Sequence, residues 1–367
     1  MRLNQPVLGN AELEAVRDVL ATGYLTQGPQ AAAFEHAVAT HTGSRHAFAT
    51  SSCTTALHLS LVALGVGPGD EVVVPDLTFP ATANVVLQQG ALPVVADIES
   101  ETFGMSADSL AAVITDRTKA IMPVHAFGLS ADMDPLIEIA DAQGIPVVED
   151  AACALGGMYK GRPCGSMGRI GAFSFHPRKI ITTGEGGMIV TDDDDLAKRL
   201  AVLRTHGSVR GPRYLSFEAL GYNYRLSDIN AAIGVAQMAR LDDILTQRRL
   251  VAEKLTMRLA QVPDVRPPVE PATSRHTFQS YVVLLNGAID RDDVIDKLKA
   301  AGIESTLGTY SLQSQPFFQN QASAMRRVAT VSRDVSRRAL TLPLHQYLND
   351  DDLDRLAETL LAAVVPT

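Results

Sequence analysis

One lysine stands where a surface charge is unusual. Lys179 lies between two apolar segments, residues 172–175 and 188–190, and is followed by the turn Thr183-Gly-Glu-Gly-Gly187. We interpret both segments as short buried strands, which places Lys179 on a tight turn at the end of a sheet. Partial desolvation there would lower the pKa of the ammonium and make the neutral amine a nucleophile. Lys179 is therefore a candidate to hold a carbonyl cofactor as a Schiff base.

Pyridoxal 5'-phosphate (PLP) would need partners that the sequence offers elsewhere. Asp150 ends an apolar strand, where a buried carboxylate requires a positive partner such as a pyridinium, although a capping role is equally compatible with the sequence. The segment Ser52-Cys-Thr-Thr-Ala-Leu57 is a strand-to-helix junction whose N–H groups favour a phosphate. Ser174 could reach the same phosphate, and Phe79 could stack on the ring or belong to the core.

Alternating strands and helices are expected to position these residues. Apolar spacing predicts helices at residues 10–22, 31–41, 79–89, 107–114, 133–143 and 196–204, and strands at 47–50, 71–75, 92–98, 119–125 and 145–150. This alternation indicates an α/β fold with a mostly parallel sheet covered on both faces. Because ligands bind outside the carboxyl ends of such strands, we expect Ser52, Phe79, His125, Asp150 and Lys179 to converge there.

The rest of the chain predicts a second domain. A single long helix is expected at residues 227–259, followed by a proline-rich break, a strand at 281–285 and helices at 292–301 and 351–364. We divide the chain into a large cofactor-binding domain with an N-terminal helical segment, residues 1–245, and a small C-terminal domain, residues 246–367.

Composition narrows the class of protein. Charged residues make up 20% of the 367 residues and the net charge is −9, which with the lack of a Lys/Arg cluster argues against a nucleic-acid partner. No apolar stretch of about 18 residues predicts a membrane span, and no apolar segment near Met1 predicts a secretory signal. Three cysteines, Cys53, Cys153 and Cys164, form neither a disulfide framework nor a metal-ligand pattern. We expect a cytoplasmic protein without a metal site.

The order of the motifs resembles the DegT/DnrJ/StrS family of PLP-dependent sugar aminotransferases over nearly the whole chain. The matching segments are Gly28-Pro29 with Phe34-Glu35, Ser52–Leu57, Gly69-Asp-Glu-Val72 with Pro75, Thr78-Phe79 with Ala81-Thr-Ala-Asn84, Val124-His125 with Gly128, Glu149-Asp-Ala151, Phe173-Ser-Phe-His176 with Lys179, Thr183–Gly187, His206-Gly207, Gly221-Tyr-Asn-Tyr-Arg225 and Leu342-Pro-Leu-His345. The lysine segment and Gly-Tyr-Asn-Tyr-Arg are the most specific of these.

The resemblance implies a fold type I, aspartate aminotransferase-like enzyme with a seven-stranded sheet, working as a homodimer with shared active sites. It assigns the Schiff base to Lys179 and the contact with the pyridine nitrogen to Asp150. The other implied cofactor contacts are Cys53 and Thr54 through their backbone, Phe79, Cys153, Ser174 and, from the partner subunit, Asn223. Candidate substrate contacts are Thr26, Glu185, Arg225 and Tyr310, of which Arg225 could instead form an interface ion pair and Glu185 could only fix its turn.

Three positions depart from the family pattern. Cys153 stands where a Gln usually supports the phenolic oxygen of the cofactor, Ala154-Leu155 replaces a nearby His, and Gln313 replaces a His near Tyr310. The first departure puts the ring-oxygen contact of Cys153 in doubt. All three suggest an altered substrate pocket.

The reaction expected from the resemblance is transamination from an amino acid, L-glutamate, to a nucleotide-linked keto sugar. The Thr183–Gly187 segment favours members that aminate at C4 over C3. Three alternatives stay open: a cyclitol (inosose) aminotransferase, a PLP-dependent sugar dehydratase, and a non-catalytic protein on the same fold. Dehydratases of the family have His at the lysine position, so Lys179 argues against that activity.

Overall fold

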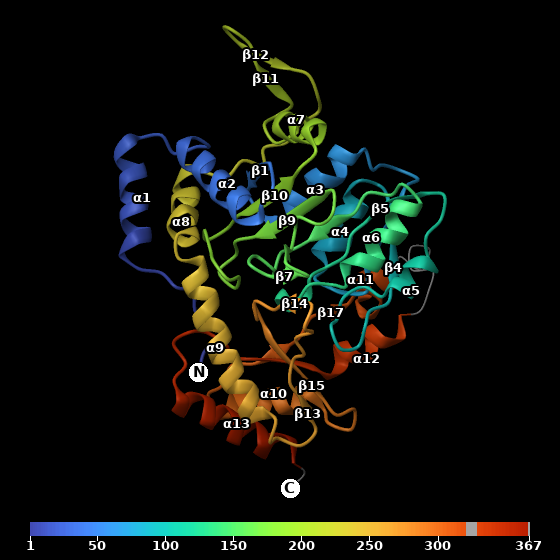
Figure 1. The fold of residues 1–367 in the computed structure, drawn as a ribbon, viewed down its shortest axis with the longest axis vertical. Helices are drawn as coiled ribbons and strands as arrows, with labels where there is room; N and C mark the ends of the chain where they lie inside the picture. The colour runs from blue at the N-terminus through green and yellow to red at the C-terminus, as the bar shows by residue number, and fades with distance from the viewer. Residues whose placement is uncertain (321–328, 366–367) are drawn as a thin grey trace.

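The computed structural model describes residues 1–320 and 329–365. Figure 1 shows a central sheet wrapped by helices, with a smaller helix-and-sheet layer below it that carries both chain termini. None of the helices within these ranges combines the length and the apolar character needed to cross a bilayer.

The N-terminal two thirds of the chain alternate between helices and strands. The helices are α1 (Asn10–Thr22), α2 (Pro29–Thr42), α3 (Cys53–Leu64), α4 (Ala81–Gln88), α5 (Ala107–Ala111), α6 (Met133–Ala142), α7 (Asp194–Leu203) and α8 (Asp228–Met238). The strands are β1 (His46–Thr50), β2 (Glu71–Pro75), β3 (Leu77–Thr78), β4 (Leu92–Ala96), β5 (Thr118–Ile121), β6 (Val148–Asp150), β7 (Met158–Tyr159), β8 (Arg162–Pro163), β9 (Ile170–Ser174), β10 (Gly187–Thr191), β11 (Ser208–Arg210) and β12 (Leu215–Phe217).

The C-terminal part is built on helices α9 (Leu241–Leu259), α10 (Arg291–Ala300), α11 (Pro316–Gln319), α12 (Thr330–Arg338) and α13 (Asp350–Val364). Its strands are β13 (Val265–Arg266), β14 (Ser274–Arg275), β15 (Tyr281–Leu285), β16 (Thr306–Leu307), β17 (Tyr310–Ser311) and β18 (Ala339–Leu342). Two short 3₁₀ helices, Ala126–Gly128 and Leu312–Ser314, complete the chain.

The central sheet has two hydrogen-bonded parts. One has the strand order β1-β10-β9-β6 and the other β4-β2-β5, and isolated parallel bridges between Ile121 and Val147 and between Val124 and Asp150 lie at their junction. Pairing is parallel except along β10, which runs antiparallel to both β1 and β9. The carboxyl ends of β1, β2, β6 and β9 therefore point to one edge of the sheet.

Side-chain alternation explains why helices cover both faces of the sheet. Val72 and Val74 of β2 share a core with α3 and α4, whereas Val73 between them packs in the core formed with α5 and α6. Successive side chains of a strand point to opposite faces, so a strand that is apolar throughout must be covered on both faces. The near-continuous apolar composition of β2 predicts this arrangement.

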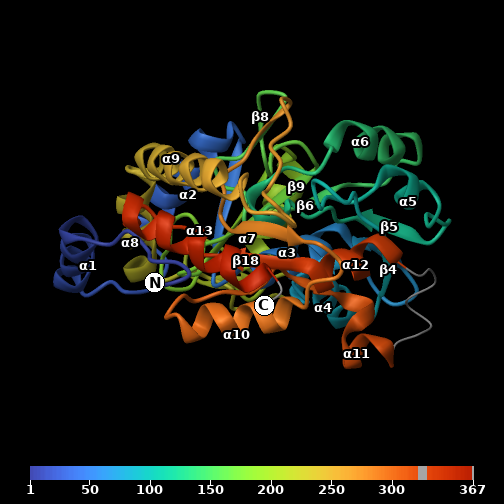
Figure 2. The same cartoon turned by 90° about the horizontal axis from the view of Figure 1, so that it is seen from below.

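The C-terminal part has its own core. An antiparallel sheet in the order β13-β15-β18-β16 packs with the apolar faces of α9, α10 and α13. Figure 2, which looks from below along the long axis, shows α13 running across the front of this part of the molecule with α10 lower in the view.

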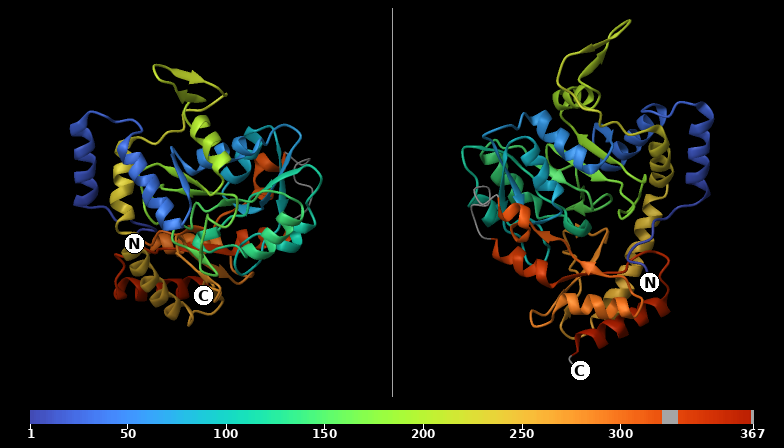
Figure 3. Two further views of the ribbon diagram at one scale, coloured as in Figure 1. Left: turned by 45° about the horizontal axis from the view of Figure 1, so that its top comes forward. Right: turned by 180° about the vertical axis from the view of Figure 1, so that it is seen from behind.

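The expectation of one long helix at 227–259 was wrong, because α8 ends at Met238 and α9 begins at Leu241. Arg240 lies at the break, where its guanidinium donates to the Val7 carbonyl oxygen at 2.8 Å and so ties the break to the N-terminal segment. The sequence analysis also missed the β11–β12 hairpin, which stands away from the body of the molecule (Figure 3).

Candidate active site

Lys179 lies on the turn between β9 and β10, and other parts of the chain hold the backbone before it. Its N–H donates to the His176 carbonyl oxygen at 2.8 Å. Asn4 donates to the Pro177 carbonyl oxygen at 3.0 Å, and Gln279 donates to the Arg178 carbonyl oxygen at 2.7 Å. The lysine turn is thus fixed by the N-terminal segment on one side and by the C-terminal part on the other.

The Lys179 ammonium donates to the Cys153 sulfur at 3.2 Å. Burial alone would lower the pKa of Lys179, but the hydrogen bond to Cys153 and the electrostatic interactions with Cys153, Cys53 and Asp150 outweigh it and raise the pKa above its ordinary value. The expected depression of this pKa was therefore wrong. Desolvation acts as anticipated, yet the thiols and the carboxylate stabilise the charged amine more.

Asp150 is the last residue of β6, and only 5% of it is exposed. It accepts hydrogen bonds from the Thr82 hydroxyl at 2.9 Å and from the Ala152 N–H at 3.2 Å. Within residues 1–320 and 329–365 it forms no ion pair, and burial raises the pKa of its carboxyl group, although both hydrogen bonds and the more distant Lys179 oppose the shift. A cation beside this carboxylate would relieve the cost of its burial.

The N-terminus of α3 supplies donors at the same edge. Ser52 caps the helix by accepting from the Thr55 N–H at 3.1 Å, so the N–H groups of Cys53 and Thr54 lack acceptors within the helix. Burial raises the pKa of the Cys53 thiol, Asp150 and Cys153 raise it further, and Lys179 opposes them. These mutual effects show that the four groups lie close together.

Gly187 allows this helix end to approach the lysine strands. In the register of the sheet it pairs with Thr50 on one side and with Ser174 on the other, so Ser174 lies across Gly187 from the start of α3. A Cβ on Gly187 would lie 2.4 Å from the Ser52 carbonyl group. Only glycine permits this contact, and Ser174, the cross-strand partner of Gly187, faces the same side of the sheet as the start of α3.

An aromatic pair borders the site. Phe79 is 64% exposed, so the core alternative for this ring is excluded. Its ring centroid is 6.5 Å from that of Tyr310, because β3 pairs with β17 and brings Thr78 opposite Tyr310. The two-residue strands β3 and β17 were not anticipated, and together with hydrogen bonds from the Leu312 and Gln313 N–H groups to Asp76 they join these distant segments.

Four of the expected site residues have no hydrogen bond or ion pair with the lysine within the described residues. Thr26, Glu185 and Asn223 are exposed, and Arg225 is half-buried with its backbone bridged to Thr50. In the described part of the chain, no hydrogen bond or ion pair connects any of them to Lys179 or Asp150.

Two neighbours of the site have roles that the sequence did not reveal. Thr82 was quoted only as part of a matching segment, although its hydroxyl is the one side-chain donor to Asp150 in the described structure. The sequence offered one signal for this role: Thr82 lies four residues, about one helical turn, after Thr78. The two hydroxyls share a hydrogen bond at 2.8 Å. His125 lies beside Asp150 as expected, since its N–H donates to the Asp150 carbonyl oxygen at 3.0 Å, but its imidazole is fully buried against Glu149 at 2.7 Å.

Comparison with known proteins identifies the class of enzyme. Residues 6–361 match the family model described as the DegT/DnrJ/EryC1/StrS aminotransferase family. The chain belongs to this family. The aminotransferase is 43% identical to the GDP-perosamine synthase of Caulobacter vibrioides, over 97% of this chain and 96% of that protein.

Solved structures agree with this assignment. The aminotransferase TlmJ from Streptoalloteichus hindustanus is 34% identical, with a TM-score of 0.93 over 99% of this chain and 98% of that one. The PLP form of the sugar aminotransferase Spr1654 from Streptococcus pneumoniae, described as putative, is 29% identical, with a TM-score of 0.92 over 99% and 98% of the two chains. This chain is thus a PLP-dependent transaminase with a fold type I architecture.

The donor set of the aminotransferase fits PLP. The Lys179 amine could hold the aldehyde, and the Asp150 carboxylate lacks the positive partner that a protonated pyridine nitrogen would supply. The Cys53 and Thr54 N–H groups at the positive end of the α3 dipole suit a phosphate, and Ser174 faces the same side of the sheet.

Proposed function

We propose that this aminotransferase transfers an amino group from L-glutamate to C4 of a nucleotide-linked keto sugar in amino-sugar biosynthesis. The observation that carries the proposal is the arrangement of Lys179 and Asp150 beside the open N-terminus of α3. The Thr183–Gly187 segment supports C4, and a 43% identical relative named GDP-perosamine synthase supports a sugar linked to a nucleoside diphosphate.

Each residue of this arrangement has a defined task. When bound, PLP supplies an electron sink that stabilises negative charge on the donor carbon. Lys179 holds the cofactor and, once released from it, moves the proton from the donor carbon. Asp150 keeps a positive charge on the pyridine nitrogen. The Lys179 amine must lose its proton to react, and the contact of its ammonium with the Cys153 sulfur at 3.2 Å opposes that loss.

Other residues bind and orient the small molecules. We assign the phosphate to the N–H groups of Cys53 and Thr54 and to the Ser174 hydroxyl, with a further contact from Asn223 of the partner subunit. The exposed ring of Phe79 would cover one face of the cofactor. Thr26, Glu185, Arg225 and Tyr310 are the candidates for substrate contacts.

We propose a homodimer with shared active sites. Large apolar side chains are exposed on α1 and on the β11–β12 hairpin: Leu13 at 68%, Leu20 at 54%, Tyr214 at 83% and Phe217 at 67%. Apolar surface of this kind marks protein interfaces. A second subunit covering these elements would also give the exposed Asn223 a partner.

We also propose a large cofactor-binding domain of residues 1–245 and a small domain of residues 246–367. The shared core of α9, α10, α13 and the C-terminal sheet supports this division. Cys53, Cys153 and Cys164 are all free, which suits a reducing, cytoplasmic compartment.

The decisive experiment supplies ¹⁵N-labelled L-glutamate with 4-keto and 3-keto sugar nucleotides and with inososes. We expect 2-oxoglutarate and a ¹⁵N-labelled sugar nucleotide whose NMR spectrum places nitrogen on C4. Nitrogen on C3 would refute the position, transfer only to inososes would favour a cyclitol aminotransferase, and a deoxygenated sugar without ¹⁵N would indicate a dehydratase.

A further inference from the structure

Arg248 of α9 is a buried cation surrounded by neutral groups. Only 5% of it is exposed. Its Nε donates to the Phe278 carbonyl oxygen at 2.6 Å, its Nη2 to the Gln279 carbonyl oxygen at 2.6 Å and its Nη1 to the Asn4 Oδ1 at 3.4 Å. All three acceptors are uncharged, so they solvate the guanidinium without neutralising it.

No counter-charge is available from the neighbouring side chains. Across residues 1–320 and 329–365 Arg248 forms no ion pair, and burial lowers its pKa to about 10. His276 and His345 are close enough to interact with its charge, but burial lowers the pKa of each imidazole, so both are neutral near pH 7. Glu270 is engaged by the adjacent Arg249 at 2.7 Å and 3.1 Å.

The other buried arginine of the described chain is paired with a carboxylate, as buried charges usually are. Arg204 is 6% exposed and forms an ion pair with Glu35. Buried charges in proteins are generally paired, because an isolated ion in a low-dielectric interior costs several kcal/mol. Arg248 departs from this rule, which suggests that its counter-ion is not part of the chain.

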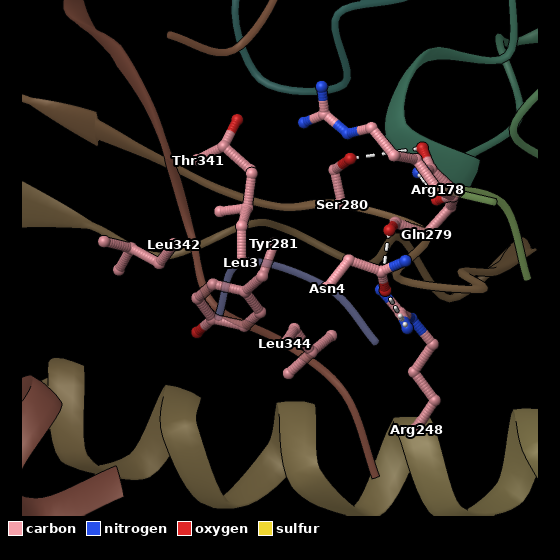
Figure 4. Close-up of a pocket in the computed structure, with 10 residues that line it drawn as sticks. All are labelled: Leu3, Asn4, Arg178, Arg248, Gln279, Ser280, Tyr281, Thr341, Leu342 and Leu344. Atoms are coloured by element: carbon pink, nitrogen blue, oxygen red, sulfur yellow. Dashed lines mark hydrogen bonds between the residues drawn. The ribbon is translucent and has the colours of Figure 1, made fainter. Parts of the chain in front are cut away.

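A small cavity lies beside Arg248. It has a volume of about 10 Å³ and is lined by Leu3, Asn4, Arg178, Arg248, Gln279, Ser280, Tyr281, Thr341, Leu342 and Leu344. Figure 4 shows Asn4 and Arg248 meeting at one side of the cavity, with Leu344 and Tyr281 near them. The volume is about that of a single water molecule, so the cavity holds one small guest at most, and Arg178 adds a second positive charge to the lining.

We propose that a monovalent anion of the size of chloride binds in this cavity as the counter-ion of Arg248. Asn4 and Gln279 also hold the carbonyl groups of Pro177 and Arg178, directly before Lys179. The anion therefore stabilises the junction of the N-terminal segment, the C-terminal part and the lysine turn. This site is separate from the proposed transamination, so either conclusion can fail without the other.

The first test compares salts on the PLP-loaded protein. At constant ionic strength, replacing gluconate by chloride or bromide should raise Tm saturably, by about 2 °C or more. Crystals grown in bromide should show an anomalous peak next to the Arg248 guanidinium. Equal Tm values in all three salts, or no anomalous peak beside the Arg248 guanidinium, would overturn the proposal.

The second test supplies the counter-ion covalently. Asn4→Asp changes an amide oxygen already in contact with Arg248 into a carboxylate of the same shape. We expect this variant to lose the chloride response, whereas its Tm in chloride-free buffer also reflects the lost donation from Asn4 to the Pro177 carbonyl oxygen at 3.0 Å. Asn10→Asp adds the same charge at an exposed position and should keep that response. A chloride response in Asn4→Asp equal to that of the wild type would contradict the assignment.

Discussion

Replacing Asp150 by Asn removes one negative charge from the end of β6 and preserves the shape of the side chain. The carboxylate is 5% exposed and has only the Thr82 hydroxyl and the Ala152 N–H as described donors. In the PLP-bound enzyme we expect it to pair with the pyridine nitrogen. Losing one partner of a buried ion pair costs about 3–5 kcal/mol. At about 1.36 kcal/mol for each factor of ten, turnover should fall roughly 150- to 5,000-fold.

The same substitution should not weaken the cofactor-free protein. Burial raises the pKa of Asp150 above the ordinary value of 3.8, so the folded state binds this proton more tightly than the unfolded state. The carboxylate therefore costs stability once the pH rises through its folded pKa, and Asn removes that cost. At pH 7 the cofactor-free Asp150→Asn protein should have a Tm equal to or above that of the wild type.

Single-turnover rates of the half-reaction with L-glutamate, measured by the change in cofactor absorbance, provide the assay. Thr82→Val removes one donor to the carboxylate but leaves its charge, so it should reduce the rate less, on the order of tenfold. An Asp150→Asn enzyme that keeps its cofactor and reacts within about fivefold of the wild type would refute the role given to this carboxylate.

Further predictions concern the other groups of the site. Lys179→Ala should lose transamination by at least about a thousandfold, and borohydride treatment followed by mass spectrometry should show no cofactor mass on the chain; retained turnover would contradict this. Burial lowers the pKa of Lys179, while Cys153 raises it. The Cys153→Ala variant should therefore load PLP at lower pH than the wild type. An unchanged or upward-shifted pH profile would argue against the contact. Gly187→Ala places a Cβ 2.4 Å from the Ser52 carbonyl group. It should weaken PLP binding by about tenfold or more in an absorbance titration. Unchanged affinity would show that α3 is not part of the site. Mixing Lys179→Ala with Asn223→Ala subunits should restore about a quarter of wild-type activity, because half of the dimers then carry one intact site; no recovery would exclude a shared site.

Local patterns in the sequence were enough to predict much of the scaffold. The apolar run at residues 71–75 became β2, and the helical spacing at residues 10–22 became α1, with the expected bounds. Lys179 and Asp150 could be placed at one sheet edge because β6 and β9 are parallel and both end there. These features depend on periodicity and on the rule for ligand sites in parallel sheets.

Features that depend on contacts between distant segments could not be predicted from the sequence. The raised pKa of Lys179 reflects thiols from two other segments, and the approach of Phe79 to Tyr310 requires two strands of two residues each to pair. The break before α9 is not marked by Pro, and it became visible only with the contact of Arg240 to Val7. Periodicity carries no information about such pairings.

The anchoring of the lysine turn has a consequence for folding. Its carbonyl groups are held by Asn4 and Gln279, and these two residues are separated by most of the chain. The turn can therefore reach its native geometry only after the C-terminal part has docked and the N-terminal segment has been laid across it. Contacts of such high sequence separation form late, since loop-closure entropy must be overcome first. A nascent chain still lacking its last third would have the catalytic lysine but not the hydrogen bond from Gln279 that helps to orient its turn.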